Sequence, residues 1–427
     1  MGCESLDRST AERIVENLRY GIPPEQHIIC FTVGREDQLR LLSSTLSGSC
    51  LDCGAALLVK ANYGAGKSHL LKVIRELALQ SGYAVSDVTV DALGGVRFNL
   101  MDTILSAVCR RITVPDLTNG ANAKKCYSGP GGLCLETCVR SSGIGALFDA
   151  YASPVAPLPD GAIRARERIS NGGRWDHSEY LSSPGLYVAL RAWINSSGGT
   201  LHDLINDWLC NVRYYGTQRR RMLYEALVMG LRDKFRDRRP EWMFYADGVF
   251  VFNTDGHRQA WGALADLHTL AKLAGLKGMV LLFDEFEDVL QNLANRNYKE
   301  QAFYNLFRFF DGERYPGMAY FAVTPDFAHK CKLELLRKGI YNFSFEQFGQ
   351  LKAFELEPIT QSQVMLLAGR LRAVHERAYG WESSSAFPGI DVARIVVREW
   401  DSASPDRVRR IVQSIVRGLD DAYKRAG

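Results

Sequence analysis

The sequence has 427 residues, of which 46% are hydrophobic and 23% are charged, with a formal net charge of +4. These values are typical of an ordinary soluble globular protein that is large enough for two or three structural units. No apolar run is long enough to span a bilayer, and the start lacks the basic-then-apolar order of a signal peptide, so we expect a cytoplasmic protein with no membrane partner.

The chain begins with helical patterns. Residues 10–21 predict a short helix, and two successive prolines predict a turn after it. Gly34 and Arg35 then open a second predicted helix, and a loop over residues 47–54 leads to an apolar strand. The first part of the chain is therefore expected to be helical up to that strand.

Residues 55–71, with the sequence AALLVKANYGAGKSHLL, predict a strand, a glycine-rich loop and a helix, which is the context of a phosphate-binding P-loop. Gly64 and Gly66 let successive backbone N–H groups converge on an anion, and the helix adds its positive N-terminus. Lys67 is expected to reach the β- and γ-phosphates, and the Ser68 hydroxyl is expected to bind Mg²⁺.

One position departs from the P-loop pattern, because Ala61 replaces its first glycine. A small side chain is tolerated there more easily than at the two glycines that flank Ala65, so the prediction of a nucleotide site stands. His69 is expected in the first turn of the helix, near the nucleotide but not as a base. The alternative is a glycine-rich turn that binds nothing. The predicted nucleotide-binding residues here are Gly64, Ala65, Gly66, Lys67, Ser68 and His69.

The middle of the chain is less regular. Residues 83–91 alternate as a strand, and residues 101–108 have helical periodicity. Between about 115 and 184 Gly, Ser, Pro and Asn become frequent, which favours long loops. Helices are expected to resume at residues 184, 200 and 217. Basic residues crowd two later segments and predict either a solvated helix face or a phosphate-binding surface: Arg219 to Arg221, Arg232, Lys234, Arg236, Arg238 and Arg239, and then Arg407, Arg409 and Arg410.

Residues 279–283 are wholly apolar, as expected of a central parallel strand, and the strand ends in Asp284 and Glu285. This is a Walker B pattern, in which Asp284 would hold Mg²⁺ through water and Glu285 would polarise the attacking water. The P-loop and this strand are too far apart in the sequence for a minimal ATPase core. Residues 113–245 are therefore expected to be an insertion, mainly helical and rich in loops.

A third strand over residues 319–324 ends at Thr324, and a helix over 326–338 carries Arg337 near its end. A last strand follows around residue 354. Thr360 and Gln363 then form the capping box of a new helix. Three final helices are expected near residues 361–379, 390–400 and 405–424.

With these residues in view, the chain resembles the ATP-binding proteins of BREX-type phage-defence clusters, which are relatives of the Orc/Cdc6 and STAND branches of AAA+ ATPases. The resemblance covers both ends of the chain and most of the core, but little of 113–245. The matching motifs are RIVENLRYGIPP, FTVGRE, YGAGKSH, LAGLKGMVLLFDEFE, VTPDF and PDRVRRIV.

The resemblance implies an α/β fold, an AAA+ P-loop core with a parallel sheet and flanking helices, and a C-terminal helical lid. It also gives residues their roles: Gly34 and Arg35 would hold the adenine, and Thr324 would be sensor 1. Arg337 would be an arginine finger, with a helix-end arginine favoured by the dipole as the equal alternative. Arg407 would be sensor 2, or else Arg409 or Arg410, although Asp406 stands where the family has an arginine. The expected units are 1–30 (helical segment), 31–112 with 246–357 (core), 113–245 (insertion) and 358–427 (lid).

The implied ligands are ATP and Mg²⁺, and the implied partners are other defence proteins, a second copy through a shared ATP site, and double-stranded DNA through the basic segments. The alternative function is a nucleotide-gated, STAND-like assembly module with little hydrolysis. A helicase is disfavoured because no second RecA-like core is found, and a GTPase because no N-K-x-D motif occurs. Cys50, Cys53, Cys126, Cys134 and Cys138 could bind zinc, but their spacing favours structural or free thiols.

Overall fold

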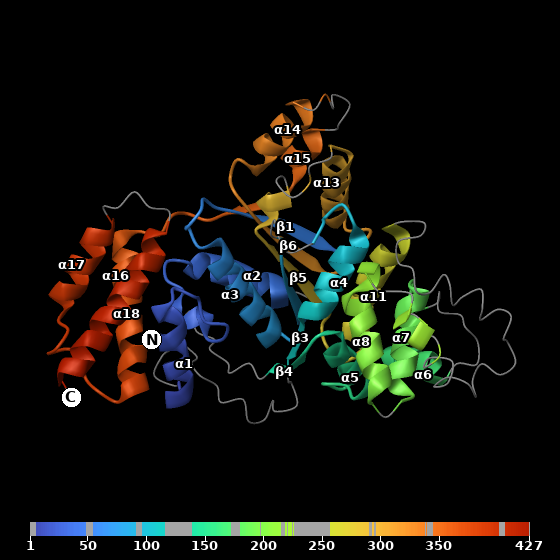
Figure 1. Cartoon of the computed structure of the whole chain (residues 1–427), viewed down its shortest axis with the longest axis horizontal. Helices are drawn as coiled ribbons and strands as arrows, with labels where there is room; N and C mark the ends of the chain where they lie inside the picture. Colours follow the sequence, from blue (N-terminus) through green and yellow to red (C-terminus); the bar gives the residue numbers. More distant parts are fainter. Residues whose placement is uncertain are drawn as a thin grey trace, which may run out of the picture.

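The computed structural model (Figure 1) places a seven-stranded sheet between two sets of helices, with a separate bundle of helices at one end. It describes residues 6–47, 54–90, 96–115, 139–171, 180–196, 198–214, 218–219, 221–223, 225, 257–289, 293, 296–337, 339, 345–400 and 406–426. Within these residues no helix combines the length and the apolarity that crossing a membrane requires.

The strand order across the sheet is β4-β3-β2-β5-β6-β1-β7. The five neighbouring strands β2, β5, β6, β1 and β7 pair in parallel. The strands β3 and β4 lie beyond β2 and form an antiparallel edge. Because the ends of parallel strands meet at one edge, the P-loop after β1 faces the ends of β5 and β6. The strands are β1 (Ala55–Lys60), β2 (Ala84–Thr89), β3 (Ile112–Pro115), β4 (Val139–Ser142), β5 (Met279–Asp284), β6 (Met318–Val323) and β7 (Ala353–Glu355).

Both faces of the sheet are covered, which explains the unbroken apolar run of β5. Alternate residues of that strand enter different cores: Leu281 and Phe283 face one, and Val280 and Leu282 face the other. The first core includes α4 (Met101–Arg111) and α11 (His257–Leu273), and the second includes α2 (Glu36–Ser47) and α3 (Lys67–Gln80). The prediction of a mixed α/β fold with a mostly parallel sheet is confirmed.

Aromatic rings fix the end of β5, where the acidic residues begin. Phe283 stacks on Phe321 of β6 with ring centroids 4.8 Å apart. Phe286, in the short helix η4 (Phe286–Asp288), meets Phe98 edge-on at 4.6 Å and Phe321 at 5.0 Å. These buried contacts hold the acidic segment against the sheet.

The described part of residues 113–245 shares the core of the sheet. Its helices, drawn in green at the lower right of Figure 1, pack with α4 and α11 in one continuous hydrophobic cluster. Trp193, Trp208 and Trp261 are buried there, so these rings serve packing. The helices are α5 (Ile144–Ala152), α6 (Asp160–Asn171), α7 (Pro184–Ile194) and α8 (Thr200–Cys210), with the turn η3 (Val212–Tyr214).

Two helix starts in this region agree with the predictions, at residues 184 and 200, whereas α5 and α6 lie where long loops were expected. Most of the helix predicted from residue 217 and the basic residues from 232 to 239 fall outside the described residues. Three further helices complete the core: α13 (Arg296–Phe310), α14 (Phe327–Arg337) and α15 (Glu346–Gln350).

The two ends of the chain form one helical unit. It consists of α1 (Arg8–Arg19), α16 (Gln361–Tyr379), α17 (Gly389–Trp400) and α18 (Arg407–Ala426), and it lies at the left of Figure 1. One hydrophobic cluster joins α1 to the other three helices. The structure thus places the N-terminal helix, expected as a unit of its own, within the C-terminal helical unit.

The predicted capping box at the start of α16 is present. The Thr360 amide donates to the Gln363 carboxamide at 2.9 Å, and the Gln363 amide donates to the Thr360 hydroxyl at 3.3 Å.

A charged contact ties α1 to α18. The Arg19 guanidinium donates two hydrogen bonds of 2.7 Å to the Asp420 carboxylate. His375 lies 3.0 Å from the same carboxylate, and its other ring nitrogen accepts from the Trp381 indole at 3.0 Å, so the nitrogen facing Asp420 carries the proton. Burial raises the pKa of Asp420, but the hydrogen bonds from Arg19 and His375 outweigh it and lower the pKa to about 2.

We expect Asp420→Asn to lower the free energy of unfolding at pH 7 by about 2 kcal/mol, because it breaks a bidentate hydrogen bond to a charged group. In the native protein this contribution is present above pH ~4, near the pKa of an unfolded aspartate, and is lost as the pH falls towards 2. Urea unfolding at several pH values measures both effects. Asp421→Asn is the control, since Asp421 is exposed; an equal loss in both variants would contradict the prediction.

Candidate functional site

The P-loop follows β1 as predicted, and α3 begins at Lys67. Gly64 and Gly66 have φ angles of +75° and +96°, a region that side chains other than glycine rarely adopt. Ala61 does not have a positive φ, and its amide donates to the Val323 carbonyl at 3.1 Å, which continues the pairing of β1 with β6. Alanine therefore replaces the first glycine of the pattern without backbone strain.

The Lys67 ammonium is buried among three partners. It donates to the Ala61 carbonyl at 3.1 Å, lies 3.4 Å from the Glu287 carboxylate, and sits 4.6 Å from the centre of the Tyr63 ring. The side chain of Lys67 is 9% exposed, and that of Glu287 is 8% exposed. The P-loop cation is thus paired within the chain itself.

The acidic residues after β5 lie in three different environments. Asp284 is half-buried at the end of the strand, where its carboxylate accepts the Glu285 amide at 3.0 Å. Glu285 is exposed and has a φ of +54°. Glu287 is buried and faces Lys67.

Glu287 belongs to neither the P-loop pattern nor the Walker B pattern. Its one signal is spacing, since residues three apart share a face in a 3₁₀ turn and Asp284 lies three positions before it.

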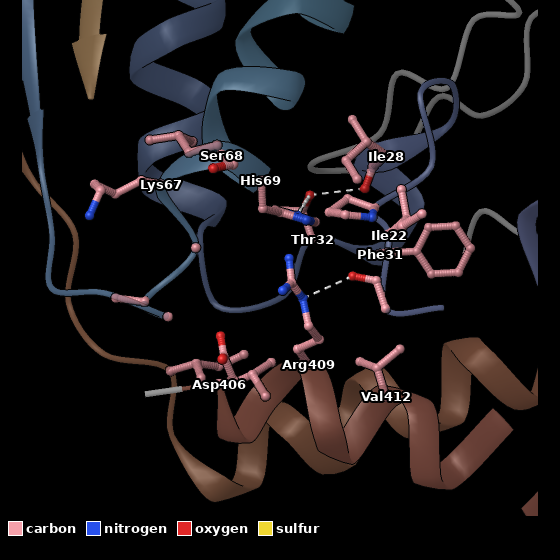
Figure 2. Close-up of a pocket in the computed structure, with 18 of the residues that line it drawn as sticks. Ile22, Ile28, Phe31, Thr32, Lys67, Ser68, His69, Asp406, Arg409 and Val412 are labelled. Carbon is pink, nitrogen blue, oxygen red and sulfur yellow. Dashed lines mark hydrogen bonds between the residues drawn. The ribbon is translucent and has the colours of Figure 1, made fainter. Parts of the chain in front are cut away.

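A cavity of about 300 Å³ lies between the P-loop and the helical unit (Figure 2). One part of its wall carries the polar groups of the P-loop and of the β5 end, among them Lys67, Ser68 and Asp284. The other part is apolar and combines side chains from both units: Leu18, Ile22, Ile28, Phe31, Val33, Ile359, Leu367, Leu371 and Val412. A cavity with an apolar end and a cationic, anion-binding end fits a ligand with a flat apolar ring and a phosphate chain.

Residues 21–35, here called the wall segment, line the cavity and are fastened to α3. The buried Glu76 carboxylate accepts the amides of Ile28 at 2.7 Å and of Ile29 at 3.4 Å. Lys72, one turn before Glu76, donates to the Pro23 carbonyl at 2.8 Å. These contacts fix the wall segment to the same helix that begins at the P-loop.

The helical unit holds the other side of the wall segment. Arg370 of α16 donates to the carbonyls of Cys30 at 3.0 Å and of Thr32 at 2.6 Å. Arg409 of α18 extends into the cavity and donates to the Gly21 carbonyl at 3.1 Å, as Figure 2 shows. The wall segment therefore connects the P-loop helix with the helical unit.

His69 is a first-turn residue of α3, as expected, and lines the cavity. Its ring nitrogen lies 2.9 Å from the Thr32 hydroxyl, which itself donates to the Ile28 carbonyl at 3.1 Å, so the imidazole is the donor to Thr32. Burial, with the positive charges of Arg35 and Lys72, lowers the pKa of His69 to about 4. The ring is thus neutral near pH 7 and holds the wall segment.

The structure brings most of the predicted site residues to this cavity but leaves four outside its wall. The residues in the wall are Arg35, Gly64, Ala65, Gly66, Lys67, Ser68, His69, Asp284 and Glu285. Those that do not line it are Gly34, Thr324, Arg337 and Arg407.

Gly34 has a φ of +64° and lies so close to the Gln363 side chain that a Cβ would be 2.0 Å from it. Arg35 donates to the Glu357 carbonyl, and burial lowers the pKa of its guanidinium. Thr324, directly after β6, is buried.

Two predicted arginines point elsewhere. The Arg337 side chain is 74% exposed at the end of α14, with Glu334 3.9 Å away. The Arg407 guanidinium lies 4.3 Å from the centre of the Trp400 ring. Of the three arginines considered for sensor 2, Arg409 lines the cavity, together with Asp406.

The structure describes only part of the first basic segment. Arg219 and Arg221 pair with Asp207 and Glu225. Within the described residues, no group of three or more His, Cys, Asp or Glu side chains could hold a metal ion. The five cysteines considered for zinc, Cys50, Cys53, Cys126, Cys134 and Cys138, lie outside them.

Comparison with protein-family models gives a match to the family described as "BREX system ATP-binding protein BrxC/D". The match covers residues 6–124 and 253–423, which is more than half of the chain and includes every residue of the cavity wall. No curated protein and no solved structure matches the chain.

We expect Arg409→Ala to weaken ATP binding about tenfold, because it removes a charged hydrogen bond that holds the wall segment and a cation that faces the cavity. Arg407→Ala, on the same helix, is the comparison and should have the smaller effect, since that side chain contacts Trp400 instead. Isothermal titration with ATP measures both affinities. A larger loss in Arg407→Ala would restore Arg407 as the sensor 2 candidate.

Proposed function

The chain belongs to the family of BREX system ATP-binding proteins BrxC/D, and from this we propose that it is an AAA+ ATPase of a phage-defence complex, with its ATP site in the cavity between the P-loop and the helical unit. The family supports a defence-associated role in ATP binding. Hydrolysis, Mg²⁺ and the partners named below are parts of the proposal.

One observation is the main support for the ATP site: residues of the P-loop, of the end of β5 and of an apolar wall line the same cavity. Gly64 and Gly66 curl the loop so that its amides, with the first N–H groups of α3, can surround a phosphate. Lys67 would neutralise the terminal phosphates, and the apolar side chains from both units would cover the base. Arg35, which lines the cavity, would contribute to holding the adenine.

Two residues of the cavity wall support the proposal of a magnesium site. The Ser68 hydroxyl is exposed in the first turn of α3, and Asp284 lies at the end of β5; both line the cavity. One hydroxyl and one carboxylate, completed by phosphate oxygens and water, suit Mg²⁺, which prefers oxygen ligands and keeps several waters. When bound, the ion would neutralise charge that develops on the phosphates.

The proposed mechanism uses residues that directly follow the strands β5 and β6. Glu285 would orient the attacking water, and Thr324 would detect the γ-phosphate from the end of β6. The topology supports this assignment, because β6 lies between the P-loop strand β1 and the acidic strand β5. Since the wall segment joins α3 to the helical unit, a change at the phosphates would move that unit and drive rearrangement of the complex.

A second function, a nucleotide-gated assembly module with little hydrolysis, is favoured by the exposure of Glu285. A carboxylate in open solvent polarises water weakly, because solvent screens its charge. In that function ATP binding alone would set the position of the helical unit, and turnover would be slow.

The proposed partners are other proteins of the defence system, in the cytoplasm. The exposed Arg337 would reach the ATP site of a second copy, which would make that site shared between subunits. The basic segments would contact double-stranded DNA through its phosphates.

We expect Glu285→Gln to bind ATP as tightly as the native protein and to lose at least 90% of its turnover, since the amide keeps the shape but cannot act as a base. Lys67→Ala should lose ATP binding altogether and serves as the control for the site. Titration with ATP and a phosphate-release assay measure the two quantities. Unchanged turnover in Glu285→Gln would remove Glu285 from the mechanism, and ATP binding in Lys67→Ala would overturn the site itself.

We expect the ATPase rate per chain to rise with protein concentration, because Arg337 would act across a subunit boundary, and to rise again when duplex DNA is added. Arg337→Ala should remove the concentration dependence and keep ATP binding. Phosphate release at several protein concentrations, with and without DNA, measures this. A rate per chain that is constant over the whole range would contradict the shared site.

A further inference from the structure

We propose that Glu287 is the counter-ion of Lys67 in the nucleotide-free protein and that it competes with the terminal phosphates of the nucleotide for this lysine. This inference rests on the proposed function, since it concerns the same site. It makes Glu287 a positioning residue, because it acts on the phosphates through Lys67.

The Lys67 ammonium has three neighbouring groups that stabilise its charge without a ligand. The Ala61 carbonyl is at 3.1 Å, the Glu287 carboxylate at 3.4 Å, and the face of the Tyr63 ring at 4.6 Å. To reach a phosphate, the ammonium must leave at least one of them. The carboxylate is the partner that opposes this most, because it carries a full charge in a buried place.

Glu287 is held where it can compete. The preceding residue, Phe286, is fully buried between Phe98 and Phe321, so the backbone of η4 is fixed to the sheet. The Glu287 side chain is 8% exposed, and its second carboxylate oxygen is buried without a hydrogen-bond partner among the described residues. Lys67 is the cation paired with this carboxylate, and the charge of the more exposed Lys330 also acts on Glu287. Removing Lys67 would therefore take away the buried partner of a buried carboxylate, which is costly.

The charge of Glu287 also acts on Tyr63, the aromatic residue that contacts Lys67. Burial, followed by the negative charges of Glu287 and Asp288, raises the pKa of Tyr63. A phenol is neutral near pH 7, and the face of this ring lies against the ammonium.

Two consequences follow for nucleotide binding. Part of the free energy gained from the phosphates is spent on separating Lys67 from Glu287, so the native protein binds ATP more weakly than its P-loop alone would allow. Binding also takes Lys67 away from Glu287, which lies close to Asp284 and Glu285 at the end of β5. Nucleotide binding at the P-loop thereby changes the electrostatic environment of the acidic residues after β5.

The test is the affinity for ATP, ADP and adenosine in the full chain, measured by titration for the native protein and for Glu287→Gln. The glutamine has the same shape but no charge, so we expect ATP and ADP to bind about tenfold more tightly. Adenosine, which has no phosphate for Lys67, should bind equally to both proteins. Asp288→Asn removes a charge from the same turn and should change the ATP affinity less than twofold.

The outcomes separate this inference from the proposed function. If the native protein binds ATP and Glu287→Gln binds it equally or more weakly, the counter-ion role is wrong while the ATP site stands. A gain that is as large for adenosine as for ATP would assign Glu287 a general effect on the cavity and also overturn the inference. If neither protein binds ATP, both proposals fail.

A second variant covers the case in which Glu287→Gln does not fold. Glu287→Asp keeps the charge but draws the carboxylate back by about one carbon–carbon bond, so the pair with Lys67 is weakened and not removed. It should bind ATP and ADP more tightly than the native protein, with no change for adenosine. Weaker or equal binding of ATP by a folded Glu287→Asp would count against the counter-ion role.

Discussion

A buried ammonium at the end of the P-loop sets the requirements for the rest of the site. Lys67 can lie there because the chain offers it a carbonyl, a carboxylate and an aromatic face. The carboxylate belongs to a turn that is fixed by aromatic packing, and that packing belongs to the core between the sheet and its helices. The partner of this one charge is thus positioned by the packing of η4 against Phe98 and Phe321.

The cavity depends on a second constraint, because no single unit encloses it. The wall segment is fastened to α3 through Glu76 and Lys72, and to the helical unit through Arg370 and Arg409. The same short stretch of backbone makes both sets of contacts. A displacement of the helical unit would therefore shift the wall segment and, through it, the helix α3 that begins at the P-loop. This is the physical basis on which a nucleotide could control the relative position of the two units.

Patterns with a local cause were predicted well. The P-loop, the apolar strand ending in Asp284 and the capped helix α16 agree closely with the structure, because each follows from residues a few positions apart. The helices α5 and α6 were missed, since the glycines and prolines around them mask their short apolar faces. The roles of Thr324, Arg337 and Arg407 stay predictions, and none of the three lines the cavity.

By its own pattern, then, the sequence determined which segments carry the phosphate-binding loop and the acidic strand, and that the sheet is mostly parallel. Only the tertiary structure decided that Glu287 pairs with Lys67, that Arg409 faces the cavity, and that α1 joins the C-terminal helices. The Arg19–Asp420 contact spans 401 positions. Such pairs leave no periodic trace in the sequence, because they depend on how separately formed elements pack together.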